Sequence, residues 1–256
     1  MNGLVLGFLG DFGDAIDFIF HKRESTLGNI KIGGPDELLH LAWTHLLVSG
    51  AGIAVACLIS IPIGLWLGHI GKGEFAAISI SNIGRAVPTL ALLTFFIAYF
   101  GVGFTNVLIA LALLAIPPIL TNCYVGVRQV DSDIVDAARG VGLSEPQLIR
   151  KVELPLALPL IFGGIRTSSV NVFATATIAP LASVNTLGTP IISANVYGAS
   201  GRLGAAILVA VLTLAVDLTL AGVQRAVTPK GLKLAQGEQK RRWLPLPQLR
   251  RREQPT

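Results

Sequence analysis

Long apolar stretches, separated by short polar segments, dominate this chain of 256 residues. A helix needs about 20 mostly apolar residues to cross the hydrocarbon core of a bilayer. By this measure the sequence predicts five membrane-spanning segments, at about residues 42–68, 75–100, 104–126, 157–182 and 204–226. The pattern therefore predicts an all-α fold, a polytopic bundle of transmembrane helices.

Prolines predict irregular backbone within two of these segments. Proline lacks the backbone N–H of a helical hydrogen bond and disfavours helix in the residue before it. We therefore expect a break near Val87-Pro88, with residues 75–85 partly interfacial, and a bend or interruption at Pro117-Pro118. Such breaks persist in membranes where neighbouring helices or a water-filled path satisfy the freed carbonyl groups.

Composition agrees with a membrane protein and removes several other classes. Hydrophobic residues make up 52% of the chain and charged residues only 14%, whereas a soluble domain has roughly 25% charged residues. Cys57 and Cys123 lie in apolar runs, which is typical of buried free thiols rather than of a disulfide or a metal pair. The four histidines show no metal-ligand spacing. No metal or cofactor is expected, and no clustered His, Cys and carboxylate residues indicate a membrane enzyme.

The distribution of Lys and Arg predicts the orientation. These residues concentrate after the third and fifth apolar segments, and such segments face the cytoplasm. The N-terminus is then outside and the C-terminus inside. We divide the chain into an extracytoplasmic segment 1–37 with a possible amphipathic helix, a transmembrane domain 38–228 and a basic tail 229–256. A sixth span within 1–25, which places the N-terminus inside, is the alternative.

The basic tail has a simple explanation. It contains several prolines and few apolar residues, so we expect a disordered cytoplasmic tail attracted to anionic lipid headgroups. Positive-inside bias already accounts for its charge, so no nucleic-acid partner is needed.

The polar segment 128–155 predicts a short helix–turn–helix between the third and fourth spans. Asp131 or Ser132 has the chemistry of a helix cap, and Gly142 can supply the left-handed turn that ends the first helix. Ser144 can cap a second helix, in which Pro146 suits an early position. The apolar side of this second helix consists of Leu148, Ile149 and Val152.

Within this segment, seven residues form a spaced motif: Asp136, Ala137, Ala138, Gly142, Val152, Leu154 and Pro155. The motif resembles the cytoplasmic "EAA" loop of ABC-importer permeases, the element that docks on the ATPase subunit. Asp136 replaces the usual Glu and Val152 the usual Ile, and both replacements keep charge or shape. The alternative is an ordinary cytoplasmic loop with a glycine turn.

Over about residues 38–232 the chain resembles the permease subunits of osmoprotectant importers, which carry glycine betaine, carnitine, choline or proline. The shared markers are residues 61–64, 86–93, 164–167 and 228–232. The resemblance implies a type I ABC-importer permease (MetI-like) in a bacterial cell membrane. It also implies a second, homologous or identical permease subunit, two ATPase subunits that hydrolyse ATP, and an external solute-binding protein. The chain itself is then not an enzyme, and it has no phosphate-binding loop of its own.

Two rival functions stay open at this stage. One is a permease of the same fold for another solute, such as methionine, a phosphonate or an alkanesulfonate. The other is a secondary carrier, which is expected to couple transport through intramembrane carboxylates and often shows inverted repeats. Residues 182–188 differ from the glycine-rich outer segment of related permeases, which leaves the identity of the docking protein open.

Polar residues inside the apolar segments are the remaining candidates. Arg166 and Asp217 fall at similar depths from the cytoplasmic boundary, and charges inside a membrane are costly unless paired or hydrated. We therefore hypothesise an ion pair between them, with lining of the solute path as the functional alternative. Thr167, Asn171 and Thr175 recur at every fourth residue, which is consistent with a polar stripe along a pore or with helix–helix hydrogen bonds.

Overall fold

The computed structural model describes residues 2–74, 79 and 88–228. Helices form nearly all of this part, and one antiparallel pair of short strands joins the first two helices. The first half contains α1 (Asn2–Phe20), β1 (Lys22–Glu24), β2 (Lys31–Gly33), α2 (Gly34–His69), α4 (Thr89–Phe100) and α5 (Phe104–Arg128). The second half contains α6 (Ser132–Gly140), α7 (Glu145–Leu148), the π-helical turn η1 (Ile149–Glu153), α8 (Leu154–Thr175), the 3₁₀ helix η2 (Ala176–Ala182), α9 (Gly188–Ile192) and α10 (Ala194–Val227).

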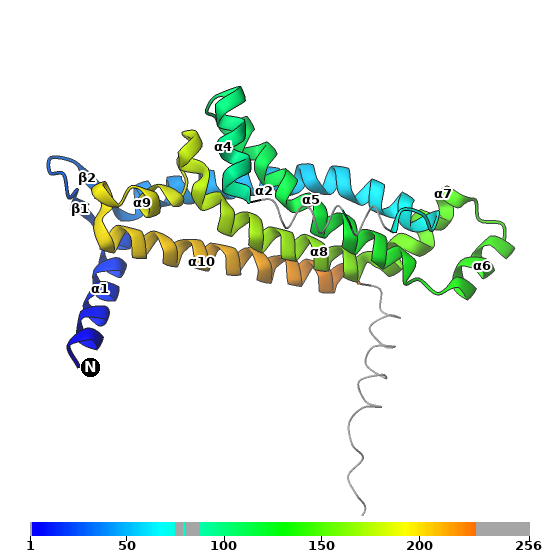
Figure 1. Cartoon of the computed structure of the whole chain (residues 1–256). Coiled ribbons are helices and arrows are strands. Elements are labelled where there is room, and N and C mark those ends of the chain that lie inside the picture. Colours follow the sequence, from blue (N-terminus) through cyan, green and yellow to red (C-terminus); the bar gives the residue numbers. More distant parts are fainter. Residues whose placement is uncertain (1, 75–78, 80–87, 229–256) are drawn as a thin grey trace, which may run out of the picture.

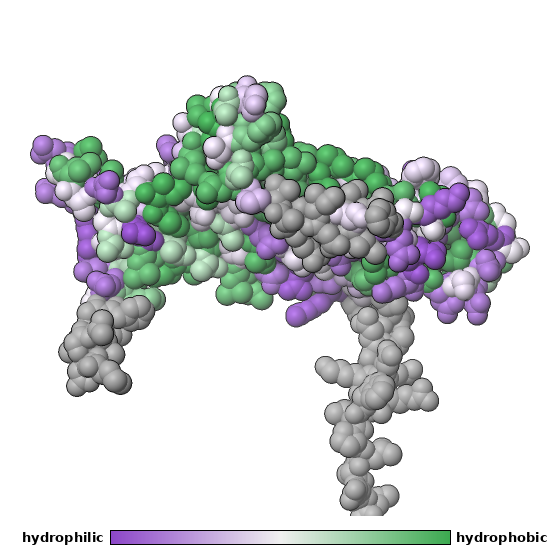
Figure 2. Space-filling model, viewed as in Figure 1, coloured by the Kyte–Doolittle hydropathy of each residue, from purple (hydrophilic) through white to green (hydrophobic). Residues whose placement is uncertain are grey.

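Four long helices, α2, α5, α8 and α10, form an elongated bundle (Figure 1). The elements α1, β1, β2 and α9 gather at one end, and α6 and α7 lie at the other. Figure 2 shows hydrophobic surface along the middle of the molecule and hydrophilic residues concentrated at the α6–α7 end. The surface thus consists of an apolar middle and polar ends.

Glycines bring α2 close to α5, which is the most extensive helix pairing in the described chain. A Cβ atom on Gly64 would lie 2.7 Å from the Cβ of Cys123, and one on Gly68 would lie 2.7 Å from the Cβ of Val127. Small residues at helix interfaces are the usual means of close packing in membrane bundles. The two helices therefore depend on these glycines for their separation.

This packing gives a first prediction. Gly64→Ala forces α2 and α5 apart, and such overpacking costs about 1–3 kcal/mol, so the thermal midpoint of the protein in detergent is expected to fall. Gly50→Ala is the matched control, because it lies on the same helix with nothing within 4 Å of the added Cβ. Thermal unfolding of both variants measures the effect, and equal midpoints would contradict the packing argument.

The observed helices agree with three of the expected spans. Among the described residues, α2, α5 and α10 are long and apolar enough to cross a membrane. The fourth expected span, 157–182, is not one regular helix: α8 ends at Thr175 and the chain continues as η2 to Ala182. The second expected span lies partly outside the described residues, because residues 75–78 and 80–87 are not described. The predictions of an interfacial segment at 75–85 and of a break at Val87 fall largely there. The described part of this span, α4, is a shorter apolar helix that begins directly after Pro88.

An interruption at Pro117-Pro118 is not found, whereas a bend there, the other form of the prediction, stays a prediction. Helix α5 runs from Phe104 to Arg128 through both prolines, which are buried. Hydroxyl groups of the neighbouring helices bond to carbonyls beside them: Ser168 donates to Ala115 at 3.0 Å and Ser60 donates to Ile116 at 3.2 Å. Hydroxyl groups of α2 and α8 thus bond to the two carbonyls just before the prolines, and tertiary packing outweighs the two lost backbone donors.

The N-terminal segment contains the expected helix, but α1 is anchored to the bundle. Ala15 and Phe18 are buried, and Phe18 packs in a cluster with Ile32, Leu38 and Val209. Helix α2 already begins at Gly34, so the boundary expected at residue 37 falls within its first turns. α1 is not among the described helices that are long and apolar enough to span a membrane.

Candidate functional site

The first candidate site is the polar loop that carries the spaced motif, and its first helix is α6. The side chain of Asp131 accepts a hydrogen bond from the backbone N–H of Asp133 at 2.9 Å, so Asp131 rather than Ser132 is the cap. A cap satisfies one of the free N–H groups of the first turn, and its negative charge suits the positive helix end. The start of α6 is therefore determined by a local capping interaction.

The turn after α6 is a left-handed glycine cap. Gly142 has φ of 88°, its N–H donates to the carbonyl of Arg139 at 2.9 Å, and the N–H of Leu143 donates to that of Ala138 at 3.2 Å. These paired bonds define a Schellman motif, which requires a residue that tolerates positive φ. Ala138 and Gly142, both members of the motif, thus fix the direction in which the chain leaves α6.

The second helix of the loop is continuous with the membrane bundle. Ser144 begins it with a capping box, in which its backbone N–H donates to the side chain of Gln147 at 3.1 Å. Leu148 is fully buried, and α7, η1 and α8 follow one another without a break. Val152, Leu154 and Pro155 lie along this continuous segment. A displacement of α7 is therefore transmitted directly to α8.

Charge pairs join the two helices of the loop. Arg139 of α6 contacts Glu145 of α7 through Nε–Oε1 and Nη2–Oε2, both at 3.2 Å, and its Nη1 lies 3.5 Å from Asp136. The hydrogen bond with Arg139 lowers the pKa of Glu145 below its usual range. The stabilisation that this pair gives to the loop is present at neutral pH, and it is lost as the pH falls through the lowered pKa of Glu145.

Apolar side chains of α6 and of the turn after it are exposed. Ile134 is 47% exposed and Val141, just past the helix, is 78% exposed. Asp136 and Ala137 are also exposed, and Ala138 is half-buried. Apolar groups exposed within a charged segment are typical of a surface that another protein covers. The motif residues of α6 thus lie at the end of the bundle that Figure 1 labels α6 and α7.

The second candidate site lies between α8 and α10, where Arg166 and Asp217 meet. The guanidinium contacts both carboxylate oxygens, Nε–Oδ1 and Nη2–Oδ2, each at 2.8 Å. Arg166 Nη1 also donates to Gln224 Oε1 at 3.3 Å, and Gln224 Nε2 donates to the carbonyl of Pro159 at 2.9 Å. This bidentate geometry is the strong form of an Arg–carboxylate pair, and it joins the two helices.

An open groove of about 450 Å³ runs beside this pair. Its lining consists of Gly163, Arg166, Thr167, Val170, Asn171 and Asp217. Thr167 and Asn171 are exposed, although the Thr167 hydroxyl also donates to the carbonyl of Gly163 at 3.0 Å. Thr175, the third residue of the expected stripe, is half-buried and does not line the groove. The structure thus brings together four of the five polar residues that the sequence analysis named in the spans.

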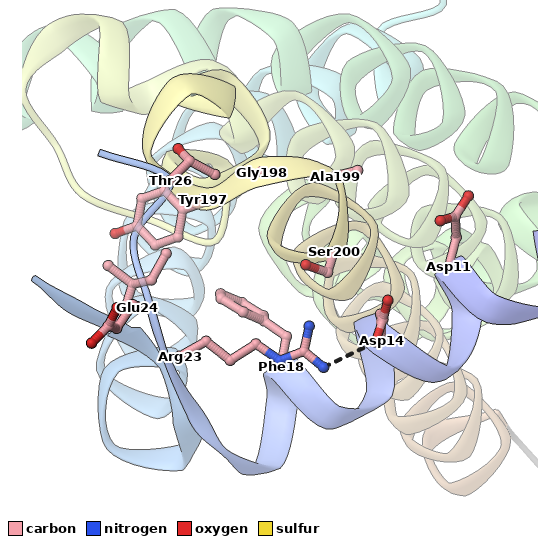
Figure 3. A pocket seen from close by; sticks show the side chains of 11 residues that line it. Asp11, Asp14, Phe18, Arg23, Glu24, Thr26, Tyr197, Gly198, Ala199 and Ser200 are labelled. Carbon is pink, nitrogen blue, oxygen red and sulfur yellow. Dashed lines mark hydrogen bonds and ion pairs between the residues drawn. The ribbon is translucent and has the colours of Figure 1, made fainter. Parts of the chain in front are cut away.

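A further cavity of about 270 Å³ lies at the opposite end of the bundle (Figure 3). It lies between α1, the β1–β2 pair and the start of α10, with Asp11, Asp14, Arg23 and Tyr197 among its lining residues. Figure 3 shows Arg23 reaching back to Asp14, an ion pair of 3.1 Å. The sequence analysis did not single out these residues. Their arrangement depends on the docking of α1, which no local pattern indicates.

The fold and the two sites together define a class, the membrane component of a transport system: an apolar helical bundle with a polar groove and a docking loop. The chain belongs to the family described as the binding-protein-dependent transport system inner membrane component, which matches residues 60–231. Its place is therefore the inner membrane. The family is a transport component and not an enzyme, and ATPase and binding-protein partners follow from membership.

Individual relatives and solved structures agree with the family. The chain is 37% identical over 198 residues to the glycine betaine/carnitine/choline transport system permease protein OpuCB of Bacillus subtilis, covering 77% of this chain and 91% of that protein. It is 36% identical to the choline transport system permease protein OpuBB of the same organism, with the same coverage. The inward-facing MetNI methionine ABC transporter has a TM-score of 0.66 at 20% identity, covering 75% of this chain and 97% of that chain. This structural likeness shows the type I importer permease fold.

Proposed function

We propose that the chain forms the translocation path for an osmoprotectant, such as glycine betaine, carnitine, choline or proline, in an ATP-driven importer. The observation that carries the proposal is the similarity to the two Bacillus subtilis permeases, whose names specify glycine betaine, carnitine and choline, all quaternary ammonium solutes. The likeness to the methionine transporter, at 20% identity, supports the fold alone. Methionine, a phosphonate or an alkanesulfonate is therefore the weaker alternative.

The 128–155 loop is the contact with the ATPase in this proposal. The exposed apolar groups of α6 dock on the motor, and the motif residues Asp136, Ala137, Ala138, Gly142, Val152, Leu154 and Pro155 hold the loop in shape. When ATP closes the ATPase pair, the loop moves with it. Because the second helix continues into α8, this movement turns the bundle between inward-open and outward-open forms, a rigid-body transition.

The groove beside Arg166 and Asp217 is the proposed solute path. Thr167 and Asn171 offer polar groups along it, while the ion pair keeps α8 and α10 together. Thr175 is assigned to helix packing, since it lies outside the groove. Weak polar contacts suit a permease, because a path that binds its solute tightly releases it slowly.

The proposed orientation follows from the charges. The α6–α7 end and the basic segment 229–256, which lies outside the described residues, face the cytoplasm, and the end with α1, β1 and β2 faces outward. A second permease subunit completes the pore, two ATPase subunits dock below, and the solute-binding protein docks on the outer end. The bilayer covers the apolar middle of the bundle seen in Figure 2.

Reconstitution tests this function. The permease is purified with the ATPase and binding protein encoded beside it and placed in proteoliposomes with ATP inside. We expect ATP-dependent accumulation of labelled glycine betaine, carnitine, choline or proline, and at least about tenfold less of methionine, whose thioether side chain and primary ammonium distinguish it from these solutes. Accumulation of methionine alone would assign the chain to the other solute class. Uptake driven by an ion gradient without ATP would instead favour a secondary carrier.

A further inference from the structure

His69, the last residue of α2, links that helix to the docking loop through both of its ring nitrogens. Its Nδ1 lies 2.9 Å from Glu153 Oε2 and 3.0 Å from Oε1, and its Nε2 lies 3.0 Å from Glu145 Oε2. The His69 side chain is 9% exposed and that of Glu153 5% exposed, whereas Glu145 is 56% exposed. One imidazole thus joins a buried carboxylate and a surface carboxylate.

This geometry specifies the protonation state of the ring. A neutral imidazole carries one N–H and one lone pair, so it can donate to only one carboxylate. The second nitrogen would then present its lone pair to a negatively charged oxygen, which is repulsive. Both contacts are favourable only when the ring is an imidazolium that donates from Nδ1 and from Nε2. The two contacts are therefore those that a doubly protonated ring can make.

The two carboxylates hold different parts of the loop. Glu153 ends the π-helical turn η1, which is continuous with α8. Glu145 lies at the start of α7 and is also held by Arg139 of α6 at 3.2 Å. His69 consequently connects α2 to α8 through one nitrogen, and to α7 and α6 through the other.

Other charged groups surround this link. From α6, Arg139 contacts Glu145 and is itself paired with Asp136. Arg150 and Lys151 are exposed on η1. From α5, the Arg128 guanidinium reaches within 3.2 Å of the Cβ position of Gly71, just beyond His69. Lys72 follows in the sequence. The imidazolium thus lies between two carboxylates, and other cationic side chains lie nearby.

We propose that His69 is a positioning residue for energy coupling, whose protonated ring clamps the docking loop to α2 and whose deprotonation frees the Glu145 arm. The exposed arm is the one released, because an unpaired buried carboxylate at Glu153 is far more costly than a solvated one at Glu145. The clamp is complete when both ring nitrogens carry a hydrogen, and its Glu145 contact is lost when one of them does not. Loop movement then passes less efficiently to the bundle. This inference rests on the proposed function.

The test measures solute imported per ATP hydrolysed by the full reconstituted complex, with glycine betaine as the probe, at several pH values between about 5.5 and 8.5. For the native chain we expect this ratio to fall about threefold to tenfold across the range, the effect of losing one charge-assisted hydrogen bond. His69→Gln should keep a low ratio at every pH. His40→Gln, on the exposed face of the same helix, should follow the native profile.

Glu145→Gln provides a second variant that leaves the buried His69–Glu153 pair intact. An amide can both donate and accept, so it bonds to either form of the ring nitrogen. Its ratio should therefore vary less than twofold with pH. A native ratio that does not change with pH, or a His69→Gln profile equal to the native one, would overturn the inference. The absence of glycine betaine uptake by the native complex would instead defeat the proposed function.

Discussion

Replacement of Gly142 by valine is expected to lower ATP-driven uptake at least about tenfold, while the ATPase subunits still hydrolyse ATP. Gly142 has φ of 88°, and its N–H and that of Leu143 close the Schellman motif on α6. A β-branched residue in this conformation costs about 1–3 kcal/mol, which the chain avoids by abandoning the turn. The docking surface of α6 then loses its fixed direction relative to α7. The measurement is uptake and ATP hydrolysis in the same proteoliposomes.

The chain offers matched controls for this variant. Gly140 is two residues earlier, is exposed, lacks positive φ and has nothing within 4 Å of an added Cβ. Gly140→Val adds the same side chain to the loop without the strain of a positive φ, so this variant should retain most of the uptake. Gly142→Asn should also retain much of it, because asparagine tolerates the left-handed region. Equal uptake by the Gly142→Val and Gly140→Val variants would refute the turn as the critical feature.

The docking loop was accessible from sequence because its structure is local. The Asp131 cap, the Gly142 turn and the Ser144 cap each depend on partners within a few residues. Capping chemistry of this kind is readable from residue type and spacing alone. Sequence also brought Arg166 and Asp217 together, since few charges occur in the apolar segments and these two have similar depth.

Features that depend on distant contacts were not accessible in the same way. His69 and Glu153 are 84 positions apart, and their contact requires the end of α2 to meet the π-helical turn before α8. Interrupted helix at Pro117-Pro118 was a sound local expectation that packing from α2 and α8 overrides. The anchoring of α1 through Phe18 is likewise a tertiary event. Local rules thus describe the loop well and the packing of the bundle poorly.

Asp217→Asn is expected to destabilise the assembled permease more than any other single change in the spans. It removes the charge that both Nε and Nη2 of Arg166 contact at 2.8 Å, and it leaves a guanidinium without a counter-charge in a proposed membrane helix. Breaking one side of such a pair is costly, because the remaining charge stays poorly solvated. We expect the thermal midpoint in detergent to fall by about 5 °C or more, with lower recovery of the complex from membranes.

The double variant Arg166→Gln/Asp217→Asn separates structure from transport in this pair. Removing both charges leaves two amides that can bond to each other and to Gln224, so most of the lost stability should return. Asp36→Asn is the control, since the Lys22–Asp36 pair at 3.0 Å is exposed and such pairs contribute little. If Asp217→Asn instead assembles with an unchanged midpoint but no longer transports, the pair acts on the solute in the groove. Recovery of stability without recovery of uptake in the double variant would show that the two charges serve both purposes.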